Sequence, residues 1–116
     1  MAHRDVLSTT LEHRGDALVV TLVGRLDSSV AENLHQMLRD AIVPTVRRLV
    51  IDLNGLDYIN SAGLRIVLMV GKQIHGAEGR VIFVGLHGIV EEVFGTCGFL
   101  IIFDTAPSLE AALGAP

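Results

Sequence analysis

The chain has 116 residues, is 50% hydrophobic and carries a formal net charge of −4. A chain of this length is expected to form one domain, residues 1–116, with enough apolar side chains for a core. The missing basic excess argues against a protein that binds nucleic acid directly, and no apolar run approaches the roughly 20 residues that cross a bilayer.

The N-terminal third predicts two strands and a helix. Residues 6–11 carry a weak strand signal and residues 17–23 a stronger one, with a polar turn between them. Asp27 or Ser28 is expected to cap the helix that follows, and Pro44 is expected to end it. The apolar positions of this helix share one face: Ala31, Leu34, Leu38, Ala41 and Ile42.

The middle of the chain predicts a buried strand followed by a helix. Residues 49–53 are almost continuously apolar, which is typical of a strand buried on both faces. The pair Asn54-Gly55 is suited to a turn and is expected to end that strand. Asn60 and Ser61 then stand at the expected start of a helix. The apolar residues of this helix recur at spacings of three and four: Leu64, Val67, Leu68, Gly71 and Ile74.

The C-terminal part continues the alternation. Residues 81–84 predict a strand, 89–94 a short helix and 99–103 a last strand, and Ser108 is expected to cap a closing helix through residue 113. The order β-β-α-β-α-β-α-β-α predicts an α/β fold with right-handed crossovers. We expect a mixed four- to five-stranded sheet with helices packed mainly on one face.

Two interpretations of Ser61 are open from the residues alone. One is a helix cap, which contributes about 1 kcal/mol. The other is a modifiable hydroxyl at an exposed junction between a strand and a helix, the place where open α/β sheets meet ligands and partners. The two interpretations are compatible, because an unmodified phosphoacceptor can still cap a helix.

The remaining reactive side chains favour neither a metal nor a nucleophile. The five histidines lack metal-ligand spacing. The single cysteine, Cys97, cannot form an internal disulfide, which suits a cytoplasmic protein, and we expect it to be half-buried. The acids Asp52, Asp57 and Asp104 could cluster at strand ends, but no lysine follows a late strand as in phospho-aspartate receivers.

Three short motifs bring a resemblance. Residues 60–65 read Asn-Ser-Ala-Gly-Leu-Arg, residues 24–27 read Gly-Arg-Leu-Asp, and Val-Glu-Glu-Val-Phe at 90–94 precedes Gly-Phe-Leu at 98–100. In this order and spacing they resemble bacterial anti-sigma-factor antagonists of the STAS family (sulphate transporter and anti-sigma-factor antagonist). The resemblance covers nearly the whole chain and implies the STAS fold.

The resemblance also implies a function. It identifies Ser61 as the residue that a serine-kinase anti-sigma factor phosphorylates. The unphosphorylated protein sequesters this kinase, phosphorylation releases it, and a serine phosphatase resets Ser61. It implies no catalysis, no cofactor and no metal in this chain. The residues that it assigns to partner binding are Asp27, Asn60, Ser61, Ala62, Gly63 and Arg65.

Two positions depart from the family pattern. Asn60 stands where relatives usually have Asp, which removes a charge beside the acceptor, and Ala62 stands where many have Ser or Thr. The alternative function keeps the fold without phosphorylation: a constitutive scaffold or adaptor subunit of a signalling or transporter complex. A small nucleotide-binding enzyme is a third possibility.

Overall fold

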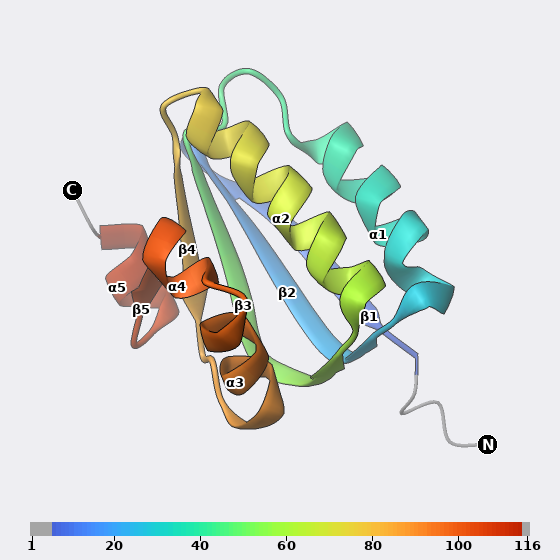
Figure 1. Ribbon diagram of the computed structural model, residues 1–116. Coiled ribbons are helices and arrows are strands. Elements are labelled where there is room, and N and C mark those ends of the chain that lie inside the picture. Colours follow the sequence, from blue (N-terminus) through green and yellow to red (C-terminus); the bar gives the residue numbers. More distant parts are fainter. Residues whose placement is uncertain (1–5, 115–116) are drawn as a thin grey trace.

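One mixed β-sheet runs through the molecule (Figure 1). The computed structural model describes residues 6–114. Within them the spatial order of the strands is β1-β2-β3-β4-β5, and only the β1–β2 pair is antiparallel. The predicted mixed sheet is therefore confirmed. The strands are β1 (Ser8–Arg14), β2 (Ala17–Leu26), β3 (Arg48–Ile59), β4 (Arg80–Val84) and β5 (Asp104–Ala106).

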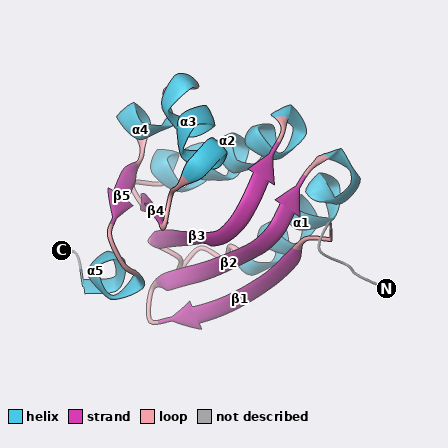
Figure 2. Cartoon of the chain, turned by 90° about the horizontal axis from the view of Figure 1, so that it is seen from below, coloured by secondary structure: helices cyan, strands magenta, loops and turns pink. Residues whose placement is uncertain are grey.

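The helices lie mainly on one face of this sheet, as expected. They are α1 (Ser28–Ala41), α2 (Ser61–Gly76), α3 (Gly88–Thr96), α4 (Phe99–Ile102) and α5 (Leu109–Gly114). The large core lies between the sheet and α1–α4, whereas α5 covers a smaller apolar cluster on the other face (Figure 2). No helix within residues 6–114 has the length and apolarity that crossing a membrane requires.

The two cores explain the strand sequences. In β2, Leu18 and Val20 point to the large core and are at most 1% exposed, while Val19 between them packs under α5. Because both faces are covered there, the strand reads as a continuous apolar run. The same holds for β4, where Ile82 and Val84 face α5 and Phe83 faces the large core.

The turn predicted at Asn54-Gly55 is wrong, because β3 continues through both residues to its end at residue 59. The long neighbouring strand β2 continues the ladder, and one extra residue of β3 is absorbed as a register shift opposite Thr21 and Val23. Asn54 donates its backbone N–H and its side-chain amide to Oδ1 of Asp52, at 3.0 and 2.8 Å. Leu53 and Asn54 together lie opposite the single residue Leu22, so this part of β3 forms a bulge.

The strand predicted at 99–103 is also wrong. Residues Phe99–Ile102 form the short helix α4, and the backbone N–H of Phe103 donates to the carbonyl of Phe99 at 2.9 Å. Gly98 starts this turn with a φ of 80°, which a side chain disfavours. One helical turn puts the rings of Phe99 and Phe103 on the core side. There Phe103 meets Phe83 edge-on, with 5.7 Å between the ring centroids. The last strand, β5, begins one residue later.

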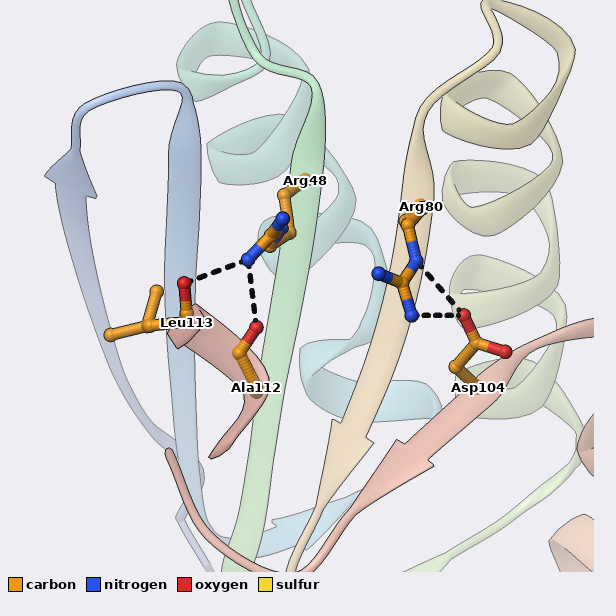
Figure 3. Close-up of polar contacts among 5 residues, drawn as sticks. All are labelled: Arg48, Arg80, Asp104, Ala112 and Leu113. Carbon is orange, nitrogen blue, oxygen red and sulfur yellow. Dashed lines mark hydrogen bonds and ion pairs between the residues drawn. The ribbon is translucent and has the colours of Figure 1, made fainter. Parts of the chain in front are cut away.

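Two arginines fasten the last elements to the sheet (Figure 3). Arg48 of β3 donates from Nη1 to the carbonyls of Ala112 and Leu113, at 3.0 and 2.8 Å, and so binds the end of α5. Arg80 of β4 donates from Nε and Nη2 to Oδ2 of Asp104, at 3.1 and 2.9 Å. This fork joins β4 to β5, and it occupies one of the acids that the sequence offered for an acidic cluster.

Candidate partner-binding site

The candidate site lies where β2 and β3 end. The last residues of the two strands, Leu26 and Ile59, are partners in the parallel ladder. Each strand passes into its helix after one residue, so α1 and α2 begin side by side at one edge of the sheet (Figure 1). The backbone N–H of Asn60 donates to the carbonyl of Leu26 at 3.2 Å, which fixes the two junctions to each other.

Asn60 caps α2. Its extended backbone precedes the first helical residue, and its Oδ1 accepts from the N–H groups of Ala62 and Gly63, at 3.1 and 3.2 Å. Its Nδ2 donates to the Ser28 hydroxyl at 3.1 Å. The interpretation of Ser61 as the cap is therefore wrong, because Ser61 is already inside the helix and Asn60 bonds the free N–H groups.

Ser61 is the first helical residue of α2, and it is exposed. Within residues 6–114 its side chain makes no hydrogen bond. The hydroxyl is thus open to solvent at a helix N-terminus, where the helix dipole favours negative charge.

Asp27 caps α1, which settles the choice between Asp27 and Ser28. The N–H and the hydroxyl of Ser29 both donate to Oδ1 of Asp27, at 2.9 and 2.6 Å. These two bonds, the hydroxyl first, and the charge of Arg25 hold the pKa of Asp27 below its ordinary value, while partial desolvation opposes them. Arg25 itself stacks on the ring of Tyr58, with 4.0 Å from Cζ to the ring centroid.

Gly63 holds α2 against β2. A Cβ atom on Gly63 would lie 2.6 Å from Cγ of Leu26 and 3.0 Å from the Leu26 carbonyl oxygen. Gly63 is buried, so it offers no surface to another molecule. Its neighbours differ: Ala62 is half-buried and Arg65 is exposed.

A groove between α1 and α2 leads away from these junctions. It has a volume of about 430 Å³, and both Ala62 and Arg65 lie on its wall. Sequence analysis did not predict it, because a polar face on α1 does not show how α1 packs beside α2. The full lining is Ser28, Ala31, Glu32, His35, Arg39, Ala62, Arg65, Ile66 and Met69.

The other candidate side chains lie apart from this site. Cys97 is exposed and not half-buried, because it stands at the end of α3 where the backbone leaves the helix. Asp52 bonds Asn54 within the bulge of β3. Across the described part of the chain, no three His, Cys, Asp or Glu side chains are grouped so that they could hold a metal ion.

Comparison with known proteins identifies a family that this chain matches. The family model described as "STAS domain" matches residues 8–112. A protein of Bordetella bronchiseptica, named "Putative anti-sigma factor antagonist BtrV", is 41% identical over 109 residues, which cover 94% of each chain.

Solved structures show the same fold at lower identity. An anti-sigma factor antagonist from Mycobacterium paratuberculosis has a TM-score of 0.86 at 24% identity, covering 99% of this chain and 97% of that one. The Bacillus protein SpoIIAA in its phosphorylated form has a TM-score of 0.73 at 24% identity, covering 90% and 96%. Its unphosphorylated form has the same TM-score at 21% identity, covering 89% and 91%.

Proposed function

The chain belongs to the STAS domain family, and from this premise we propose that it is an anti-sigma-factor antagonist switched by phosphorylation of Ser61. The observation that carries the proposal is the exposed, unbonded Ser61 hydroxyl at the first residue of α2. A kinase can reach such a hydroxyl without unfolding the domain. The relative that is 41% identical is named "Putative anti-sigma factor antagonist BtrV".

The unphosphorylated protein binds a serine-kinase anti-sigma factor over the edge where α1 and α2 begin. Asp27, Asn60, Ser61, Ala62 and Arg65 form the contact surface. The buried Gly63 contributes by position, because it sets how closely the α2 start lies to the end of β2. The protein acts as a binding module and catalyses nothing.

Phosphorylation releases the partner through charge. A phosphate on Ser61 adds about −1.5 to −2 charges. At a helix N-terminus that charge is favoured by roughly 0.3–1 kcal/mol, so the fold is retained. Against a partner the same charge must be buried, which costs several kcal/mol when uncompensated. Both the unphosphorylated and the phosphorylated form of SpoIIAA match the fold of this chain, each with a TM-score of 0.73, which supports a switch without refolding.

Asn60 suits this role although relatives usually carry Asp. Its oxygen makes both capping bonds, and its amide holds Ser28, a bond that a carboxylate cannot donate. Because Asn60 is neutral, a kinase that approaches Ser61 meets one negative charge fewer than it would beside an Asp.

A serine phosphatase then removes the phosphate from Ser61 and resets the protein.

A binding and phosphorylation experiment tests the proposal. The purified chain is incubated with each serine-kinase anti-sigma factor encoded in its source genome and ATP, and mass spectrometry reads the product. We expect one phosphate, on Ser61, from one kinase. We also expect Ser61→Ala to bind that kinase and Ser61→Asp to bind at least tenfold more weakly. No phosphate and equal binding of both variants would instead support the constitutive scaffold.

A further inference from the structure

The groove between α1 and α2 begins where the proposed contact surface ends. Ser28, whose hydroxyl is bonded by Asn60, forms its wall on the α1 side, and Ala62 and Arg65 form its wall on the α2 side. The groove then continues along both helices as far as Arg39. At 1.5 Å per residue, Arg39 lies about 16 Å along the axis from the start of α1.

The charge of this groove is opposite to that of the chain. The whole chain has 13 acidic and 9 basic residues. The groove holds two arginines, Arg39 and Arg65, against a single acid, Glu32, with His35 between them. No ion pair joins Glu32 to either arginine within residues 6–114. Both guanidinium groups are therefore available to a carboxylate from another molecule.

The contact surface around Ser61 needs such an extension. A stable protein complex buries about 800 Å² on each partner, and an interface core is made mostly of apolar side chains. The residues at the helix starts are few and polar. Met69, which is 46% exposed on the groove wall, supplies an apolar contact next to Arg65. The groove thus offers an apolar centre flanked by positive charge.

We propose that this groove is the second half of the partner interface and takes an acidic segment of the anti-sigma factor. Carboxylates of that segment pair with Arg39 and Arg65, and an apolar side chain beside them packs on Met69. This inference rests on the proposed function and names the chemistry of the partner's surface.

The proposal also explains why a phosphate at Ser61 expels the partner. Ser61 and Arg65 are four residues apart in α2, so their side chains share one face of the helix. A phosphate at the mouth of the groove repels an acidic segment, and it offers Arg65 a competing anionic partner. Phosphorylation therefore acts on the groove as well as on the contact at Ser61.

The test uses the kinase that the chain binds and compares charge reversals inside and outside the groove. Arg39→Glu removes a groove cation far from Ser61. Lys72→Glu makes the same charge change on the exposed part of α2, outside the groove lining. Because Arg39 also stands in the last turn of α1, Arg39→Gln is measured beside it, and thermal unfolding is recorded for every variant.

We expect Arg39→Glu to weaken the Kd for the kinase about tenfold, Arg39→Gln to weaken it less, and Lys72→Glu to change it less than twofold. Raising the salt concentration should weaken kinase binding by the wild type more than kinase binding by Arg39→Glu, because salt screens exposed charge pairs. If Arg39→Glu binds as the wild type does while Ser61→Asp does not bind, the groove proposal is wrong and the Ser61 switch stands. If Ser61→Asp binds as Ser61→Ala does, the proposed function itself is wrong.

Discussion

The close approach of α2 to β2 gives the sharpest test of the site's construction. Gly63→Ala adds a single methyl group at the second N–H that Asn60 caps. That methyl would lie 2.6 Å from Cγ of Leu26, 3.0 Å from Cγ1 of Ile59 and 3.0 Å from the Leu26 carbonyl oxygen. Leu26 is fully buried and its carbonyl bonds Asn60, so neither group can move aside cheaply.

The magnitude follows from two opposing terms. Overpacking of a filled core costs about 1–3 kcal/mol. Replacing glycine stabilises by about 0.4–1 kcal/mol, because the unfolded chain loses freedom. The net free energy of unfolding should fall by about 1–2 kcal/mol, and for a domain of this size Tm should fall by about 4–8 °C.

Gly76→Ala is the matched control. It makes the same chemical change in the last turn of the same helix, where an added Cβ meets nothing within 4 Å. It should raise the free energy of unfolding by about 0.4–1 kcal/mol. Urea unfolding followed by circular dichroism measures both variants. A Gly63→Ala protein as stable as the wild type would refute the packing of the α2 start on β2.

The other predictions concern the cap, the core and an acid. Asn60→Ala should cost about 1 kcal/mol in urea unfolding and Asn60→Asp less, because only Asp keeps a capping oxygen; equal losses would contradict the cap. Phe94→Ala should cost about 3–5 kcal/mol, whereas Ile101→Ala, at a side chain 90% exposed, should stay within about 0.5 kcal/mol; the same urea titration measures both, and similar losses would contradict the described core. The carboxyl of Asp27 should titrate below 3.8 by NMR, and Ser29→Ala should raise its pKa. The lowered pKa stabilises the folded protein at any pH above the ordinary pKa of an Asp, and this stability is lost as the pH falls through the folded-state pKa. An Asp27 pKa at its ordinary value would contradict the bonds from Ser29.

Periodicity and helix-capping chemistry predict most of this fold from the sequence. Apolar runs in β2 and β4 are long because both faces of those strands are covered, so their signal was strong. The start of α1 at Asp27 and the bond from the N–H of Ala111 to the Ser108 hydroxyl follow from local capping chemistry.

The two wrong predictions of secondary structure have a common cause. Asn54-Gly55 has turn propensity, but β2 continues beside it and holds the segment in the sheet. Residues 99–103 have strand propensity, but one helical turn buries both Phe99 and Phe103 against the other phenylalanine rings. In each case a distant contact outweighs a local preference of a few tenths of a kcal/mol to about 1 kcal/mol.

The candidate site divides in the same way. Ser61, Asn60 and Asp27 could be identified from their local patterns, and the structure brings all three to one edge. Which of Asn60 and Ser61 caps α2 could not be predicted from the sequence, because either residue type caps a helix. The groove between α1 and α2 depends on how two helices pack, and no local pattern gives that separation.

The stack of Arg25 on Tyr58 supplies a natural spectroscopic reporter. The chain has one tyrosine and no tryptophan, so light of a wavelength that phenylalanine does not absorb excites a single ring, two residues before Asn60. That ring lies under a cation at 4.0 Å, and a shift of this arrangement changes the light that it emits. A change at the nearby Ser61 that reaches this stack could therefore be followed in real time, in the unlabelled protein, from the emission intensity of one side chain.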